Sequence, residues 1–226
     1  MHILAHRANW KGASPYQENT LSAARYCFEQ GWGIETDIRR AQDRRFYFSH
    51  DPSELMKANH ADAFCSLFRQ FPDAIIALNI KELDYESDLL HYLSEQMVLN
   101  QVFLFDMELL ETRIGQTSQL FRRLSSNIKL AARVSDRGEP IDRALSIESA
   151  DIIWLDEFDG LWITEEDILH LKSADKKIYA ISPELHGFSR MDMKKRWFEF
   201  YTWGVDGICT DYAEHLAKKL ASNFTS

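Results

Sequence analysis

The sequence is poor in cysteine, proline and glycine, with three, five and nine of these residues among 226. Cys27, Cys65 and Cys209 are scattered and odd in number, which argues against a disulfide framework or a cysteine-based metal site. They indicate reduced core thiols and a cytoplasmic location. Because linkers rich in proline or glycine are also absent, residues 1–226 are expected to form one domain.

A long apolar run and an excess of positive charge are missing too. No stretch approaches the roughly eighteen consecutive apolar residues of a membrane span, so we expect no stable membrane insertion. We also expect no signal peptide ahead of the first strand. The 26 basic and 35 acidic residues leave a net charge of −9, which argues against a nucleic-acid partner, because binding phosphate backbones needs a basic surface. The pattern specifies no oligomeric state.

Short apolar runs alternate with helix-like segments along the whole chain. The predicted strands are Ile3–His6, Gly33–Ile38, Phe46–His50, Ala74–Ile80, Gln101–Asp106, Ile128–Arg133, Asp151–Leu155, Lys177–Ile181 and Asp206–Thr210. The predicted helices include Thr20–Gln30, Glu54–Gln70, Ser87–Met97, Glu165–Ser173, Lys194–Trp203 and Glu214–Ala221.

The number of strand–helix units predicts the architecture. Phe46–His50 follows the second strand across a turn at 42–45 and is interpreted as its continuation. Eight units then remain, and eight such units close into a parallel (β/α)8 barrel, the TIM barrel. An open doubly wound sheet is the competing architecture. It usually carries a glycine-rich loop after its first strand, which this chain lacks.

Polar residues recur where the predicted strands end. They are His6-Arg7, Glu35 with Asp37, His50, Asn79 with Lys81, Asp106, Arg133, Asp156, Glu184 with His186, and Asp211. In a closed parallel barrel the active centre lies at this carboxyl end of the strands. The order along the chain therefore predicts that these residues surround one site.

Glu35 and Asp37 are two positions apart on one strand, so both side chains point to the same face. If that face is the barrel interior, the two carboxylates repel each other unless a cation lies between them. A hard, oxygen-seeking cation such as Mg²⁺ or Ca²⁺ is the natural partner. The alternatives are a pair on the outer surface or a pair bonded to Arg39 or Arg40.

His6 and His50 end different strands, so they are able to flank one substrate phosphate. One neutral histidine removes a proton from a hydroxyl while a protonated one assists the leaving oxygen. The simpler interpretation of each is a structural hydrogen bond. Asp51 is expected to cap the following segment or to orient a neighbouring side chain.

Asn79 and Lys81 also share one strand face, after a strongly apolar stretch. A lysine that points into a barrel mouth is costly unless it meets an anion. The alternative places Lys81 beyond the strand, in solvent.

The pattern resembles the glycerophosphodiester phosphodiesterase family. The family's His-Arg-Gly, Pro-Glu-Asn-Thr, Glu-x-Asp, His-Asp and closing Gly-Val-Asp-Gly-Ile-x-Thr-Asp motifs are matched by His6-Arg7-Ala8, Gln17-Glu18-Asn19-Thr20, Glu35 and Asp37, His50-Asp51, and Gly204–Asp211. The first and last strands both fit, so the resemblance frames the whole barrel.

The resemblance implies an enzyme that cleaves a small phosphodiester at a single divalent cation, Mg²⁺ or Ca²⁺. It implies that His6 and His50 are the acid–base pair, and that Glu35 and Asp37 are metal ligands. Arg7 and Lys81 would hold phosphate oxygens. In related enzymes a neighbouring substrate hydroxyl attacks phosphorus first and forms a cyclic phosphate.

This chain departs from the family pattern in three places. The Glu-x-Lys of the family's third strand is replaced by Asn79-Ile80-Lys81, so a neutral amide stands where a third acidic ligand is usual; an amide oxygen still binds hard cations. The segment that encloses the glycerol group is short, spanning 52–72. The later strands carry their own polar residues, which are expected to bind substrate or supply the missing carboxylate: Asp106, Arg133, Asp156, Glu184 and His186. Helix capping is the simpler interpretation of Asp106 and Asp156.

Three hypotheses stay open at this point. The first is a metal-assisted phosphodiesterase. The second is a barrel that binds a phosphorylated metabolite without converting it. The neutral Asn79 and the lack of a long segment to enclose a glycerol group favour this hypothesis. The third is a lyase-like enzyme that stops at the cyclic phosphate.

Overall fold

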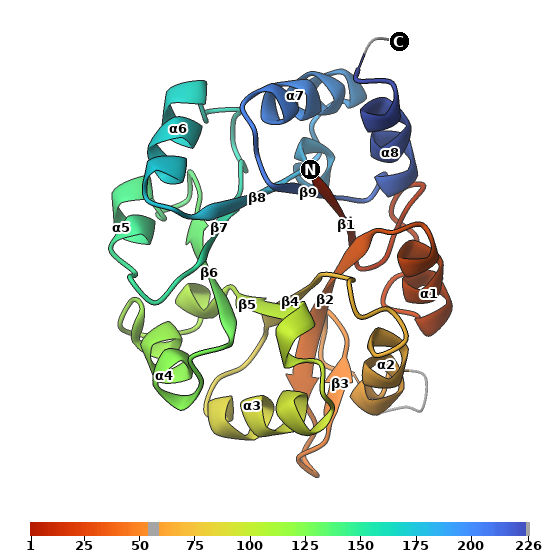
Figure 1. Ribbon diagram of the computed structural model, residues 1–226, viewed down its shortest axis with the longest axis vertical. Helices are drawn as coiled ribbons and strands as arrows, with labels where there is room; N and C mark the ends of the chain where they lie inside the picture. The colour runs from red at the N-terminus through yellow and green to blue at the C-terminus, as the bar shows by residue number, and fades with distance from the viewer. Residues whose placement is uncertain (54–58, 225–226) are drawn as a thin grey trace.

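The computed structural model describes residues 1–53 and 59–224, in which a closed parallel barrel is surrounded by helices (Figure 1). The strands are β1 (His2–His6), β2 (Gly33–Arg40), β3 (Phe46–Phe48), β4 (Ile76–Ile80), β5 (Val102–Phe105), β6 (Lys129–Val134), β7 (Ile152–Leu155), β8 (Lys177–Ile181) and β9 (Gly207–Thr210). All except β3 are paired in parallel, and β1 pairs with both β2 and β9, which closes the ring. The predicted (β/α)8 TIM barrel is confirmed.

An outer layer of helices covers the barrel (Figure 1). The helices are α1 (Leu21–Glu29), α2 (Ala61–Phe68), α3 (Glu86–Glu95), α4 (Gln116–Leu124), α5 (Ile141–Leu145), α6 (Glu165–Ser173), α7 (Arg190–Thr202) and α8 (Ala213–Ala221), with single 3-10 turns at η1 (Leu99–Gln101), η2 (Met107–Leu109) and η3 (Pro183–His186). Among the described residues, no helix is long and apolar enough to cross a membrane.

The predicted helices agree with the structure to within a few residues where both are defined. The first residues of the predicted helix Glu54–Gln70 lie outside the described residues, and α2 begins at Ala61. The predicted helices did not include α4 or α5. The buried face of α4 consists of Thr117, Ser118 and Phe121, so it has only one large apolar residue, and α5 is only five residues long. α7 begins four residues before the predicted Lys194 because Ser189 caps its first turn.

One strand runs in a different direction from the prediction. β3 does not continue β2 but folds back on it as an antiparallel arm, with Ile38 opposite Phe48 and Arg40 opposite Phe46. The reversal of the chain has a local cause. Arg44 adopts a left-handed φ of 72° in the turn, and the Ala41 amide donates to the Arg45 carbonyl. The fold-back returns the chain toward the barrel mouth.

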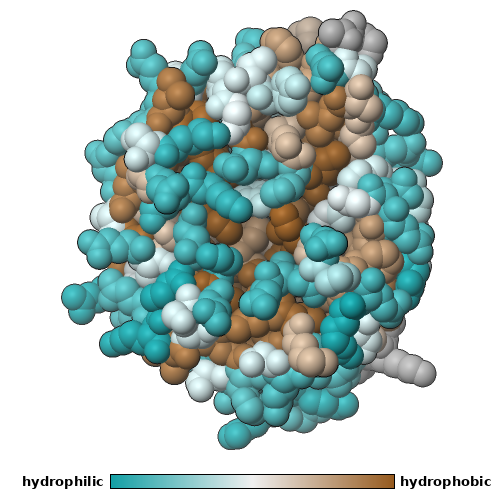
Figure 2. Space-filling view, in the orientation of Figure 1, coloured by the Kyte–Doolittle hydropathy of each residue, from teal (hydrophilic) through white to brown (hydrophobic). Residues whose placement is uncertain are grey.

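Side chains alternate between two apolar layers along each strand. Ile3 and Ala5 of β1 pack outward against the helices, whereas Leu4 points into the lumen. The lumen is filled by Leu4, Ala77, Phe103, Phe105, Ala131, Ile152, Trp154, Tyr179, Ile181 and Cys209. The barrel is therefore a packed core and not an open channel. Figure 2 shows one end of the molecule, where hydrophilic residues ring a centre of hydrophobic ones.

Two strand glycines make room for the large side chains of the lumen. A Cβ at Gly33 would lie 2.3 Å from the Ile75 carbonyl oxygen and 2.6 Å from the Leu4 side chain. A Cβ at Gly207 would lie 2.5 Å from the Tyr179 ring. Both distances are too short for real contacts, so glycine is required here by packing.

We expect Gly33→Ala to lower the free energy of unfolding by about 2 kcal/mol or more, because the backbone of Ile75 cannot move away without distorting the barrel. Gly160→Ala is the matched control: no atom lies within 4 Å of its Cβ position, so a change within about 0.5 kcal/mol is expected. Urea unfolding followed by circular dichroism measures both. Equal stabilities of the two variants would contradict this account of the lumen.

Candidate active site at the barrel mouth

The lumen changes from apolar to polar over the last layer of side chains. Two residues beyond Leu4 on the same strand comes His6, and two beyond Ala77 comes Asn79. The same step leads from Ala131 to Arg133, from Trp154 to Asp156 and from Cys209 to Asp211. Because every second residue points inward, these polar groups converge at the carboxyl end of the barrel.

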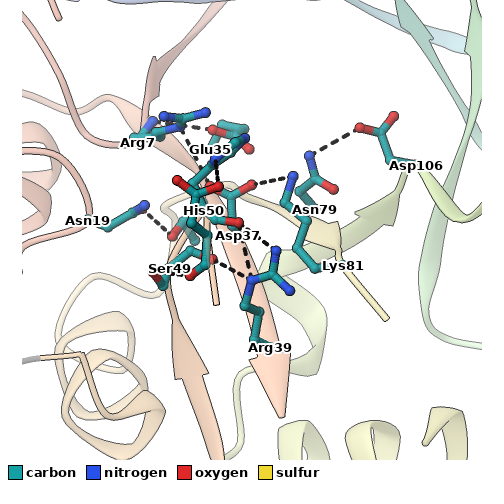
Figure 3. Close-up of polar contacts among 12 residues, drawn as sticks. Arg7, Asn19, Glu35, Asp37, Arg39, Ser49, His50, Asn79, Lys81 and Asp106 are labelled. Atoms are coloured by element: carbon teal, nitrogen blue, oxygen red, sulfur yellow. Dashed lines mark hydrogen bonds and ion pairs between the residues drawn. The ribbon is translucent and has the colours of Figure 1, made fainter. Parts of the chain in front are cut away.

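The acidic pair of β2 lies in this layer and is almost completely buried. Glu35 and Asp37 are 3% and 1% exposed, and Figure 3 shows them with the surrounding polar side chains. The alternative of pairing with neighbouring arginines is wrong. Arg39 instead donates to the backbone carbonyls of Ser49 and His50 and pairs with Glu82, while Arg40 pairs with Asp88.

Positive groups from two segments compensate the two carboxylates. Lys81 Nζ lies 2.9 Å from Asp37 Oδ1, and Arg7 Nε lies 3.6 Å from Asp37 Oδ2. The Arg7 backbone amide donates to Glu35 Oε2 over 3.2 Å. Burial and the charge of Asp37 nevertheless raise the pKa of Glu35 to about 7. Protein groups alone therefore do not fully balance this pair.

His6, at the end of β1, is fixed by Asp211, which follows the neighbouring strand β9. Its Nδ1 lies 2.8 Å from Asp211 Oδ1, and Asn9 Nδ2 donates to the same oxygen over 3.1 Å. Nε2 consequently faces the acidic pair, 3.8 Å from Glu35 Oε2. Burial lowers the pKa of His6, but the Asp211 hydrogen bond and the charges of Glu35 and Asp211 outweigh it, and the pKa is raised.

Asp211 was predicted to lie in this cluster, because it stands at a strand end and ends the closing motif, but no role was predicted for it. The signal that could have shown its contact with His6 is barrel closure. β9 pairs with β1, so the residue after β9 necessarily lies next to the end of β1, where His6 is located.

The turn after β1 adopts an uncommon backbone conformation. Arg7 and Ala8 have φ values of 49° and 63°, in the left-handed region that is costly for residues with a Cβ. Ala8 occupies the position of the glycine in the His-Arg-Gly motif. The turn aims the Arg7 amide at Glu35 and its guanidinium at Asp37 and Glu18, so this backbone serves the site.

His50 reaches the mouth through the antiparallel arm. The Ser49 amide donates to the Asp37 carbonyl over 3.0 Å, and Arg39 holds the His50 carbonyl (Figure 3). The imidazole Nδ1 lies 2.9 Å from Asp51 Oδ1, so Asp51 orients its neighbour, one of its two predicted roles. The His50 side chain is 42% exposed, against 23% for His6.

Lys81 and Asn79 both point into the mouth. The solvated alternative for Lys81 is wrong, because its side chain is 18% exposed and paired with Asp37. Asn79 is buried beside Asp37, its partner in the strand register, and its Nδ2 donates to Asp106 Oδ2 over 3.1 Å.

A buried network occupies the other half of the mouth. Arg133, 6% exposed, bonds to both Asp106 and Asp156, and Asp156 also bonds to His186, whose ring packs 4.2 Å from that of Phe158. Asp106 and Asp156 are therefore network members. The capping expectation is wrong for both: η2 begins after Asp106 without a side-chain cap, and Asp156 is bonded to Arg133 and His186.

Glu184 lies at the same end but is already engaged. It accepts hydrogen bonds from Ser182, from the Thr210 hydroxyl at 2.5 Å and from the Asp211 amide at 3.1 Å. Burial raises its pKa. These contacts hold the end of β9 and so support the acceptor of His6, while direct contact of Glu184 with substrate stays a prediction.

The half of the mouth that contains Glu35 and Asp37, the acidic half, has oxygen groups that suit a hard cation. Asp37 Oδ2 is buried and has no hydrogen-bond partner among the described residues, which is what an oxygen ligand without its metal would show. No three His, Cys, Asp or Glu side chains in the described part of the chain form a metal site. Asn79, beside Asp37 in the strand register, offers a neutral oxygen of the kind that hard cations bind.

The fold and its polar mouth together define a (β/α)8 barrel whose carboxyl end is lined by acidic and basic side chains. No protein-family model and no curated protein matches the sequence. Solved structures do. A barrel from Galdieria sulphuraria that is assigned to the glycerophosphodiester phosphodiesterases has a TM-score of 0.74 at 17% identity, covering 97% of each chain.

Two further structures are similar. A glycerophosphodiester phosphodiesterase from Parabacteroides distasonis has a TM-score of 0.72 at 16% identity, covering 99% of this chain and 98% of its own. An Oleispira antarctica phosphodiesterase, solved with the product sn-glycerol-3-phosphate, has a TM-score of 0.66 at 16% identity over 98% and 97%. A 3-hexulose-6-phosphate synthase also matches, at 0.58 and 10%. At such identities the likeness establishes the fold, and activity must be argued from the site.

We expect Glu35→Gln and Asp37→Asn each to weaken Mg²⁺ or Ca²⁺ binding by more than about 100-fold, since changes to groups behind the ligands already cost about 10–100-fold. Glu18→Gln is the matched control, because Glu18 contacts Arg7 but not the acidic pair. Isothermal titration calorimetry measures all three. Unchanged binding in the two β2 variants would place the cation elsewhere.

Proposed function

We propose that this protein is a metal-dependent phosphodiesterase, a phosphoric diester hydrolase that acts on a small glycerophosphodiester-like or other phosphodiester. The observation that carries the proposal is the geometry of His6. Its Nδ1 is held by Asp211 and its Nε2 faces the buried Glu35–Asp37 pair. A protein that only binds a ligand needs no oriented histidine beside two carboxylates.

The reaction follows from groups that the mouth brings together. Arg7 and Lys81 hold the nonbridging phosphate oxygens, which carry the negative charge. One of the two histidines, His6 or His50, accepts the proton of the attacking hydroxyl as its oxygen bonds to phosphorus. The other delivers a proton to the leaving oxygen as the ester bond breaks.

The nucleophile is either water or a neighbouring hydroxyl of the substrate. In the second case the first product is a cyclic phosphate, and water then opens it while the two histidines exchange roles. Protons are conserved in both routes, because each proton taken from a nucleophile is matched by one given to a leaving oxygen.

A divalent cation, Mg²⁺ or Ca²⁺, would be held by Glu35, Asp37 and Asn79. When bound, it neutralises negative charge that develops on the phosphate. Two observations support this placement. Asp37 Oδ2 accepts no hydrogen bond among the described residues, and burial beside Asp37 raises the pKa of Glu35.

The far half of the mouth is proposed as the site of the substrate's alcohol groups. His186, with a side chain 18% exposed, reaches its surface, and Arg133 and Asp156 lie beneath it. Glu184 borders the same half. The product bound to the Oleispira antarctica neighbour supports a small phosphodiester as substrate. Three unpaired, buried cysteines support a cytoplasmic location, and residues 1–226 are proposed to act as one domain.

A barrel that binds a phosphorylated metabolite without converting it is the alternative, favoured by the neutral Asn79. The two functions differ in whether phosphodiester bonds are broken, which phosphorus NMR detects directly.

We expect ³¹P NMR of a phosphodiester panel, incubated with Mg²⁺ or Ca²⁺, to show a new monoester or cyclic-phosphate signal. His6→Ala and His50→Ala should each slow its appearance about 10²–10⁴-fold, because each removes a positioned acid or base. His91→Ala, on the exposed surface of α3 with a side chain 74% exposed, should retain full activity.

Turnover that survives in the double variant His6→Ala, His50→Ala would disprove the proposed mechanism. A silent panel together with phosphate-ester binding would favour the metabolite-binding barrel. A cyclic product that persists would instead identify the lyase-like reaction.

A further inference from the structure

The two halves of the mouth are joined through one amide. Asn79 stands in the strand register between Asp37 of β2 and Phe105 of β5. Its Nδ2 donates to Asp106 Oδ2, in the residue that follows β5. Asp106 is in turn bonded to Arg133, which also bonds to Asp156. A chain of hydrogen bonds thus runs from Asn79, the register neighbour of Asp37, to Asp156 in the far half of the mouth.

A neutral ligand has a requirement that a carboxylate does not have. A carboxylate offers an oxygen whichever way it is turned, whereas an amide offers oxygen on one limb and N–H donors on the other. With its NH₂ toward a cation, Asn79 would repel it. The affinity of this site therefore depends on what fixes the amide.

Asp106 is placed to fix it. A carboxylate bonded to a guanidinium accepts hydrogen bonds and offers no donor, so the Asn79 limb that faces it must be the NH₂. The amide oxygen is then the limb that does not face Asp106. The contact is buried, since Asp106 is 8% and Asn79 9% exposed, and water does not compete freely for it.

We propose that Asp106, anchored by Arg133, is a positioning residue that turns the Asn79 amide oxygen toward Glu35 and Asp37, so that a neutral side chain completes the cation site. This rests on the proposed function, because the cation site belongs to that active centre. Direct ligation by Asp106 is the rival reading. It is disfavoured because Asp106 Oδ1 is bonded to Arg133 and Oδ2 to Asn79.

The first test is the Mg²⁺ and Ca²⁺ affinity of Asp106→Asn, measured by isothermal titration calorimetry. We expect a loss of about 10–100-fold, the range typical of groups that orient metal ligands. Asp156→Asn is the matched control, because Asp156 bonds to the same guanidinium but not to Asn79; its affinity should stay within about twofold. Equal effects of the two variants would overturn the proposal.

A double-mutant cycle distinguishes positioning from direct ligation. If Asp106 acts through Asn79, then Asp106→Asn costs no further affinity once Asn79→Leu is present. A full additional loss in that background would make Asp106 a ligand in its own right and overturn the proposal. Thermal unfolding by circular dichroism checks that each variant is folded.

The exchanged pair Asn79→Asp, Asp106→Asn supplies a rescue that a purely structural role would not show. The carboxylate at position 79 needs no orientation, and the amide at position 106 still donates to it, so affinity should return at least to that of the natural protein. The amide NH₂ signal of Asn79, followed by NMR in metal-free protein, should shift in Asp106→Asn and not in Asp156→Asn.

The outcomes separate this inference from the proposed function. Phosphodiester turnover with cation affinity that is insensitive to Asp106, or with no cation binding at all, would overturn the inference and leave a phosphodiesterase. Cation binding that depends on Asp106 without turnover on the ³¹P NMR panel would support the inference and count against the enzyme.

Discussion

Two carboxylates buried on one face of one strand are the constraint on which the rest of this structure depends. Glu35 and Asp37 are nearly inaccessible to water, and burial together with the charge of Asp37 raises the pKa of Glu35. The positive groups around them are Arg7 after β1 and Lys81 after β4, and the imidazole of His6, held by Asp211, faces Glu35. In a chain of net charge −9, this concentration of cations at one end of the barrel is what suits an anionic substrate.

The neutral Asn79 lowers the negative charge of the proposed cation site. The site has one carboxylate fewer than the Glu-x-Lys pattern of the glycerophosphodiester phosphodiesterases would provide. We therefore expect the substrate phosphate to contribute more to binding the cation. The compensation is geometric: Asp106 and Arg133 constrain an amide that would otherwise be free to turn. The same network reaches Asp156 and His186. It therefore connects Asn79 to the far half of the mouth, which is proposed to bind the alcohol groups of the substrate.

The barrel itself says little about chemistry. It is shared with glycerophosphodiester phosphodiesterases and with a 3-hexulose-6-phosphate synthase, and one scaffold carries many reactions through the residues at its carboxyl end. The contacts of His6, Glu35 and Asp37 are therefore what supports the proposed phosphodiesterase. The far half of the mouth, where Glu184 is already bonded to Ser182 and Thr210, is where this chain differs most from the family motifs.

Local spacing in the sequence predicted the barrel, the shared face of Glu35 and Asp37, and the place of His6 at a strand end, because side-chain direction along a strand follows from its two-residue period. Only the tertiary structure decided which groups meet. His6 and Asp211 are 205 residues apart and touch because β9 closes on β1. Asp106 and Asp156 had the local appearance of helix caps, yet a guanidinium between them makes them one network. The direction of β3 depended on a turn at Arg44 that hydrophobic alternation does not encode. Partners are selected by register and closure, which no local pattern specifies.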